Sequence, residues 1–142
     1  MGDEIKIGNP HEVLARILQE AKLLTEYAEQ LNNDTKEFPR LESKLEETEQ
    51  TVYNRIRRSH NLIEQYRSYG ESSEQQRAIA DMQKELVFFE NQLQTVKQCK
   101  EDLVCMQQDY LSLIKECNYR ADSGRVLAGK LEILMNKIID AK

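Results

Sequence analysis

The sequence has few of the residues that break helices or fill the core of a β-sheet protein. Its 142 residues include five Gly, two Pro, three Phe and no Trp. A chain with so few Gly and Pro residues has few obligatory turns, and strands are typically rich in aromatic and β-branched side chains. These scarcities favour an all-α fold and argue against a sandwich or a barrel.

Long apolar runs are also missing. No stretch reaches the roughly 18 apolar residues that a membrane-spanning helix requires, and the first residues, MGDEIKIG, contain no hydrophobic signal segment. The cysteines Cys99, Cys105 and Cys117 are odd in number and form no CxxC pair, as is typical of reduced thiols. We therefore expect a cytoplasmic protein, with the nucleus as the alternative.

Patterns that would indicate catalysis or cofactor binding are absent from the sequence. His11 and His60 fall in different expected helices, and the cysteines do not have the spacing of metal ligands. The segment GRVLAGK, Gly124–Lys130, fits the GxxxxGK spacing, but a P-loop requires a preceding strand and a Ser or Thr where this chain has Leu131. We predict no catalytic, cofactor-binding or metal-binding residues, no small-molecule substrate and no enzymatic activity.

The apolar residues of the chain recur with the period of an α-helix. Asn9 is a good N-cap, Pro10 suits the first helical position, and Glu12 follows at the third. Apolar or small residues then alternate at spacings of three and four, which predicts a helix over about 10–31. These residues are Leu14, Ile17, Ala21, Leu24, Ala28 and Leu31.

The segment 32–39, NNDTKEFP, interrupts this pattern with weak helix formers and a proline. We favour a tight turn here, followed by a second helix over about 40–69. The alternative is one kinked helix, because counting by sevens from Ile17 to Tyr66 keeps the apolar pattern in phase across the break. The inward residues expected of the second helix are Leu41, Leu45, Val52, Ile56, Ile63 and Tyr66.

Gly70 is expected to end that helix as its C′ residue. Ser72 and Ser73, with Gln75 and Gln76 at the third position, are expected to begin a third helix over about 74–119. Its apolar line contains two spacings of three at Leu93, Val96 and Cys99, a stammer that predicts a local change of neighbours. After Cys99 we expect the line to continue through Leu103, Met106, Tyr110, Leu113 and Cys117. The segment 122–124, DSG, predicts a turn before a short helix over about 125–141.

These elements define the fold class that we predict. It is an all-α, elongated antiparallel helical bundle or coiled coil of three long helices and one short C-terminal helix. We expect a flexible N-terminus over 1–8 and a single domain over 9–142.

Three arginines, Arg55, Arg57 and Arg58, stand close together in a chain of net charge −5. None has a carboxylate three or four residues away, so their partners must come from outside their own helix. Interhelical pairing is the favoured interpretation, with Arg58 opposite Glu85 in a hairpin and with Asp81 and Glu90 one turn to either side. An acidic protein partner is the alternative, whereas nucleic acid or anionic lipid is disfavoured because the rest of the chain is acidic.

The last helix shows two apolar faces. The larger is expected to be its core face and contains Leu127, Ala128, Leu131, Leu134, Met135, Ile138 and Ile139. Nearly opposite lies a narrow line formed by Val126, Gly129 and Ile133, flanked by Lys130, Lys137 and Asp140. We expect this line either to pack inside the chain or to bind another helix.

The layout looks like non-catalytic coiled-coil subunits of cytoskeletal, kinetochore-type or vesicle-tethering assemblies. A spectrin-type repeat has a similar helix count, but the Trp usual in such repeats is missing. We therefore predict an adaptor or scaffold that contacts other helical proteins or a second copy of itself. The alternatives are a membrane-trafficking regulator acting beside lipid and a small chaperone-like bundle that holds a client helix.

Overall fold

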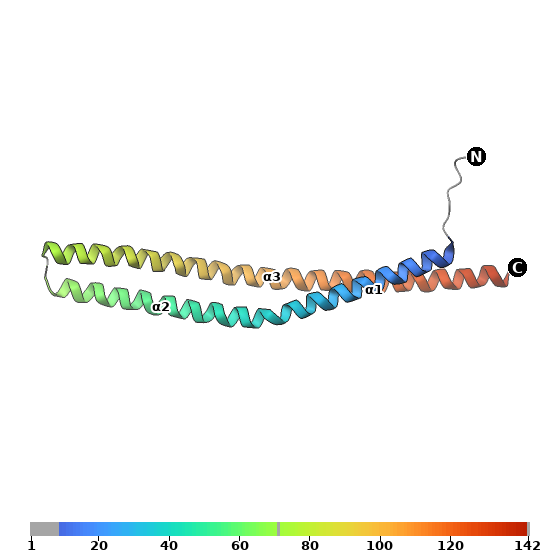
Figure 1. The fold of residues 1–142 in the computed structure, drawn as a ribbon, viewed down its shortest axis with the longest axis horizontal. Helices are drawn as coiled ribbons and strands as arrows, with labels where there is room; N and C mark the ends of the chain where they lie inside the picture. The colour runs from blue at the N-terminus through green and yellow to red at the C-terminus, as the bar shows by residue number, and fades with distance from the viewer. Residues whose placement is uncertain (1–8, 71, 142) are drawn as a thin grey trace, which may run out of the picture. The chain divides into compact units, whose positions relative to one another are not determined.

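The computed structural model describes residues 9–70 and 72–141, and every regular element in them is a helix (Figure 1). Helix α1 spans Pro10–Asp34, the 3₁₀ helix η1 spans Thr35–Glu37, α2 spans Phe38–Ser68 and α3 spans Ser73–Asp140. The all-α prediction is confirmed. The tail predicted over residues 1–8 lies outside the described residues.

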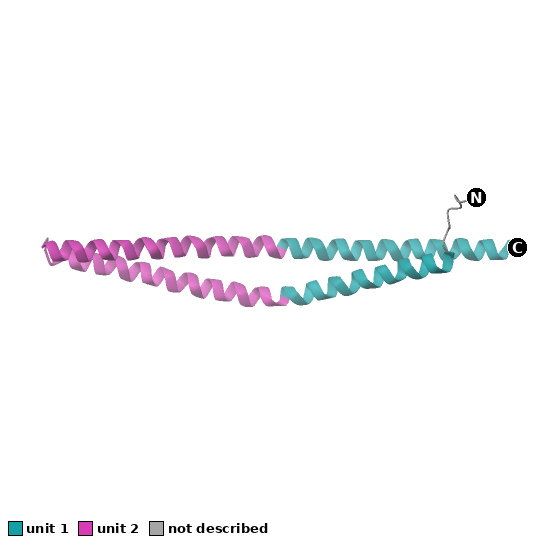
Figure 2. Cartoon of the chain, turned by 45° about the horizontal axis from the view of Figure 1, so that its top comes forward, with its two compact units in different colours: residues 1–35, 108–142 teal, residues 36–107 magenta. Residues whose placement is uncertain are grey.

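The chain divides into two compact units (Figure 2). Unit 1 contains Met1–Thr35 and Gln108–Lys142, and unit 2 contains Lys36–Gln107. Within unit 1, α1 packs against the C-terminal part of α3; within unit 2, α2 packs against its N-terminal part. Each unit is therefore a pair of antiparallel helices, and α3 contributes one helix to both.

The start of α1 follows from its first residues. The side chain of Asn9 accepts a hydrogen bond of 3.0 Å from the backbone N–H of His11, and Pro10 occupies the first turn. The cap satisfies one of the N–H groups that have no partner within the helix, and proline lacks the N–H that would otherwise also need one. The predicted N-cap is confirmed.

The tight turn that we favoured at 32–39 is not formed. Helix α1 passes into α2 through the single turn η1, and the backbone of Thr35 and Glu37 stays in the right-handed helical region. Pro39 lies in the first turn of α2, where its ring and missing N–H do not disrupt the helix. Helical backbone continues through this segment, as the alternative to the turn required, and the in-phase apolar pattern predicted it.

The turn between α2 and α3 matches its prediction. Gly70 has a φ of 120°, which favours glycine, directly after the C-cap residue Tyr69. Ser72 and Gln75 then form a reciprocal capping box, in which each backbone N–H donates to the other residue's side chain at 3.2 Å. The turn reverses the chain and sets the antiparallel pairing of unit 2.

The predicted break between a third and a fourth helix is wrong, because α3 runs without interruption through residues 119–125. Gly124 lies inside the helix, and a Cβ added there would be 3.6 Å from the Cβ of Ala21 on α1. An interior glycine costs about 1 kcal/mol of helix propensity, and the helix nevertheless continues through Gly124, which lies against α1. Asp122 supports the helix too, by accepting from Arg125 at 3.1 Å.

The predicted stammer is also wrong. We call the line of buried and half-buried residues along each helix its seam. On α3 the seam keeps alternating spacings of four and three beyond Val96. Cys99, Met106 and Leu113 are exposed instead of inward. The positions that replace them in the seam are Lys100, Gln107 and Ile114.

Alanines are the most deeply buried residues in the seam of unit 1. Ala21, Ala28, Ala121 and Ala128 are each at most 4 % exposed. Small residues allow two helices to approach closely, but they bury little apolar surface. In residues 9–70 and 72–141, no helix has the length and apolar character that crossing a membrane would require.

Candidate helix-binding surfaces

The arginine cluster on α2 does not form the ion pairs that we predicted. Among the ion pairs of the described residues, none joins Arg55, Arg57 or Arg58 to a carboxylate of α3. Arg55 instead places its guanidinium 5.8 Å from the ring centroid of Phe89, a cation–π contact across unit 2. All three arginines are exposed, so their positive charge faces solvent or a partner.

The ion pair that does join α2 and α3 was missed. Lys100 Nζ lies 3.1 Å from a carboxylate oxygen of Glu49, and both residues occupy seam positions. The hydrogen bond to Glu49 raises the pKa of Lys100, and the nearby charges of Glu49, Glu46 and Glu42 raise it further against the opposing effect of burial. Counting by sevens from Leu93 would have placed Lys100 in the seam.

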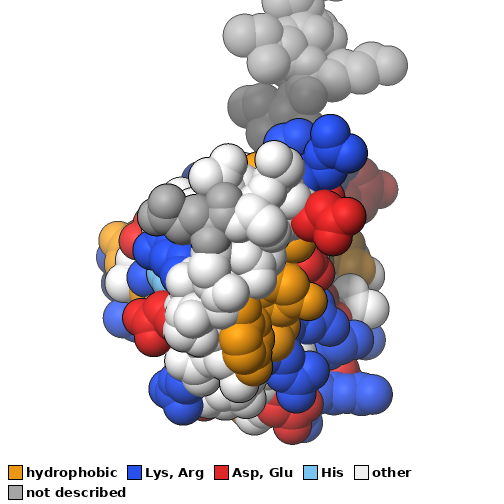
Figure 3. Space-filling view, turned by 90° about the vertical axis from the view of Figure 1, so that its left-hand side faces the viewer, with side chains coloured by type: hydrophobic (Ala, Val, Ile, Leu, Met, Phe, Trp, Pro, Cys, Tyr) orange, Lys and Arg blue, Asp and Glu red, His pale blue; other side chains and the backbone are white. Residues whose placement is uncertain are grey.

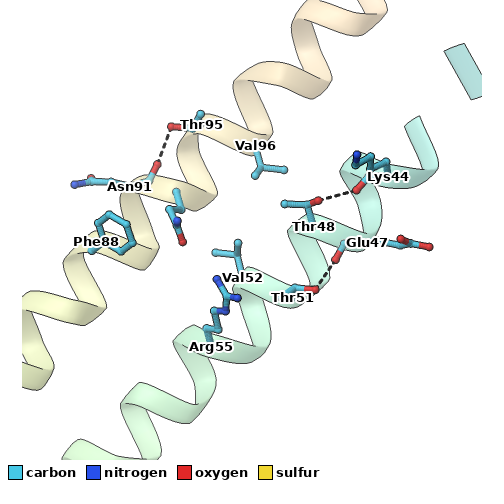
Figure 4. A pocket seen from close by; sticks show the side chains of 11 residues that line it. Lys44, Glu47, Thr48, Thr51, Val52, Arg55, Phe88, Asn91, Thr95 and Val96 are labelled. Carbon is cyan, nitrogen blue, oxygen red and sulfur yellow. Dashed lines mark hydrogen bonds between the residues drawn. The ribbon is translucent and has the colours of Figure 1, made fainter. Parts of the chain in front are cut away.

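A groove lies on one flank of unit 2, between α2 and α3 (Figure 4). Its volume is about 630 Å³, and Val52, Val96 and Phe88 give it an apolar floor and edge. The hydroxyls of Thr48, Thr51 and Thr95 donate to backbone carbonyls of their own helices, so they present methyl groups rather than free donors. The groove therefore suits an apolar side chain better than a charged ligand.

One polar atom of this groove lacks a partner. Among the described residues, Gln92 Oε1 is buried without a hydrogen bond, and Gln92 lines the groove together with Lys44 and Arg55. A buried acceptor without a donor costs about 1–3 kcal/mol.

The line Val126, Gly129 and Ile133 is on the surface of α3. Val126 and Ile133 are 58 % and 57 % exposed, and nothing lies within 4 Å of a Cβ added at Gly129. Tyr119, seven residues before Val126, continues the line and is 74 % exposed. Of the two expectations for this line, packing inside the chain does not occur.

The predicted core face of the C-terminal segment is only partly correct. Ala128 is buried, and Leu131 and Met135 are half-buried, all three in the seam. Leu127, Leu134, Ile138 and Ile139 are instead more than half exposed. The error follows from the missing turn, because a continuous α3 presents a narrow seam to one partner helix rather than a broad face to a bundle.

Aromatic residues gather at the turn end of unit 2. The rings of Tyr66 and Tyr69 form an edge-on pair with centroids 6.3 Å apart, and Tyr69 is 68 % exposed. Figure 3 views this end of the molecule and shows hydrophobic side chains on the surface next to charged ones. Apolar surface is thus exposed in both units.

Comparison with protein-family models, with curated proteins and with solved structures gives no match to this chain. Among the described residues, no three His, Cys, Asp or Glu side chains cluster as metal ligands would. Cys99 and Cys105 are exposed and Cys117 is buried in the seam, all three as free thiols. The exposed apolar lines of the helices are therefore the candidate binding surfaces.

Proposed function

We propose that the protein is a non-catalytic coiled-coil adaptor of the cytoplasm that binds other helical proteins along exposed apolar lines of its helices. The observation that carries the proposal is the line Tyr119, Val126 and Ile133 on α3. These residues are seven apart and 57–74 % exposed, on the side of the helix away from the seam. A seven-residue apolar repeat on a free helix face is the pattern that a partner helix recognises.

Gly129 adds to the shape of this surface. It stands between Val126 and Ile133 with open space where a side chain would be. A partner helix can approach the backbone there, as it does where Ala21 meets Gly124 inside unit 1. Lys130 and Lys137 lie beside the line, so an acidic rim on the partner helix would complement it.

The test uses Gly129→Leu. A Cβ added at this position meets nothing within 4 Å in the free protein, and leucine removes the glycine's helix-propensity penalty. The isolated variant should therefore be as stable as the wild type or more so. Its recovery of stoichiometric helical partners from native cell extract should fall, and cross-links from position 126 to those partners should disappear.

The control is Gly124→Ala, which changes a glycine of the same helix at the face already covered by α1. It should leave partner recovery unchanged. Equal partner recovery by Gly129→Leu and the wild type would contradict the proposal. Co-sedimentation with anionic liposomes that Gly129→Leu abolishes would support instead the lipid-side alternative, for which Lys130 and Lys137 provide the charge.

A further inference from the structure

The two flanks of unit 1 differ in polarity, and the more polar one still exposes Leu18, Leu111 and Ile139. One flank is identified by its contacts: Arg125 donates to the hydroxyl of Thr25 at 2.7 Å, and a shallow hollow beside them is lined by Asn32 and Asn118. In an antiparallel pair of helices, the residue just before every second seam position lies on the flank opposite to these contacts. We call that side the apolar flank; it contains Val13, Tyr27, Leu113, Leu127 and Leu134.

The large side chains of the apolar flank are exposed. Leu113 and Tyr27 are 38 % and 46 % exposed, and Leu127 and Leu134 are both 54 % exposed. They stand at spacings of seven or fourteen along their helices. Inside unit 1 the most deeply buried residues are alanines, with Leu31 and Cys117 also buried in the seam. The exposed apolar side chains of the flank contribute little to this contact between α1 and α3.

We infer that the apolar flank binds the same flank of a second copy of this chain, so that two units 1 form a four-helix bundle. The inference extends the proposed function, since it rests on the same helix–helix mode of contact, but it concerns a different face from the line through Val126 and Ile133. Two helix pairs that meet flank to flank cover the exposed leucines of both copies.

The size of the flank fits a stable dimer. From Leu113 to Leu134 the helix rises about 33 Å, and two adjacent helices are about 20 Å wide. Such a face covers roughly 650 Å² on each copy, or roughly 1,300 Å² in total, which falls within the range of specific interfaces, about 1,200–2,000 Å².

Charge favours a copy of the same chain and sets its orientation. The line of α1 on this flank contains Glu20 and Asp34, whereas the line of α3 contains Arg120, which also pairs with Glu116 of its own helix at 2.8 Å. A two-fold axis along the helices brings the acidic line of one copy to the basic line of the other. A perpendicular axis would oppose like charges, which disfavours it. In the favoured orientation every neighbouring pair of helices is antiparallel.

The experiment is sedimentation equilibrium of the full chain over a range of micromolar concentrations. We expect a monomer–dimer equilibrium that Leu127→Ser with Leu134→Ser weakens by roughly 100-fold or more in Kd. Because both side chains are more than half exposed, the helix content measured by circular dichroism should be unchanged. The control is Leu111→Ser with Ile139→Ser on the polar flank, residues that are 55 % and 61 % exposed; it should dimerise as the wild type does.

A second variant tests the charge argument without removing apolar surface. Glu20→Lys with Asp34→Lys should weaken the dimer at low salt, and high salt should reduce the difference from the wild type. A monomeric wild type, or a dimer that the control pair weakens as much as the leucine pair does, would overturn the inference. Gly129→Leu should leave dimerisation intact, so failure here and failure of the proposed function are separate results.

Discussion

Lys100 of α3 and Glu49 of α2 form an ion pair of 3.1 Å between seam positions of unit 2, with side chains 35 % and 22 % exposed. Apolar seam residues slide past one another at little cost, whereas a charged pair has one satisfactory register. The pair therefore sets which residues of α2 face which residues of α3.

Reversing one charge of this pair should destabilise unit 2. Glu49→Lys puts two positive charges together in the seam, so its melting temperature should fall by several degrees, and adding Lys100→Glu should restore most of the loss. Glu47→Lys, at an exposed position of the same helix, is the control and should change the melting temperature little. Thermal melts monitored by circular dichroism measure these changes. A double variant no more stable than Glu49→Lys would refute the pairing.

The same pair predicts a dependence on alkaline pH. Because the pKa of Lys100 is raised in the folded chain, its contribution to stability is complete below the unfolded lysine pKa of about 10.4. It is lost as pH rises through the higher folded value. The difference in melting temperature between the wild type and Glu49→Gln should thus stay constant from neutral pH to about 10 and shrink above it. A difference that shrinks between neutral pH and pH 9 would assign the effect to another group.

The two helical glycines should respond differently to enlargement. Gly124→Ala adds a Cβ at ordinary contact distance from Ala21 and should stabilise by about 0.5–1 kcal/mol through helix propensity. Gly124→Leu should overpack the contact with α1 and cost about 1–3 kcal/mol, whereas Gly129→Leu, in open space, should not destabilise. Urea titrations of the three variants test this, and equal effects of leucine at both positions would contradict the packing of Gly124 against α1.

The arginine cluster yields a pair of double-mutant cycles. Arg55→Ala with Phe89→Leu should show a coupling of about 0.5–1 kcal/mol, the value of an exposed cation–π contact. Arg58→Ala with Glu85→Ala should show no coupling, because the structure does not join them. A coupled second cycle and an uncoupled first would restore the charge pairing predicted from the sequence.

Periodicity predicted the helices well and their connections less well. The inward line of α1 and the capped turn at Gly70 and Ser72 follow from residues close together in the sequence, and the structure has both. Judged from neighbouring residues alone, Pro39 and Gly124 predict breaks in the helices. In the structure Pro39 lies in the first turn of α2, and Gly124 lies inside α3 against Ala21 of α1. The contact of Gly124 with Ala21 joins residues that are distant in sequence, so no local rule could supply it.

The surfaces were predictable in part. The exposed line through Val126 and Ile133 follows from angular position alone, whereas exposure of Leu127 and Leu134 depends on how many helices surround α3. Arg55 was expected to pair with a carboxylate because only charged partners were considered. Its contact across unit 2 is the ring of Phe89. Lys100 was overlooked because a lysine is not expected in an apolar seam.

The most direct test of the whole account is amide hydrogen exchange, followed by NMR, across residues 119–127 of the full chain. If α3 is one helix that serves both units, the amides of Asp122, Ser123 and Gly124 should be protected as strongly as those one turn to either side. Cα chemical shifts through this segment should also stay helical. Rapid exchange at these three residues, with non-helical shifts at Gly124, would mean that α3 is two helices joined by a turn and would contradict the account.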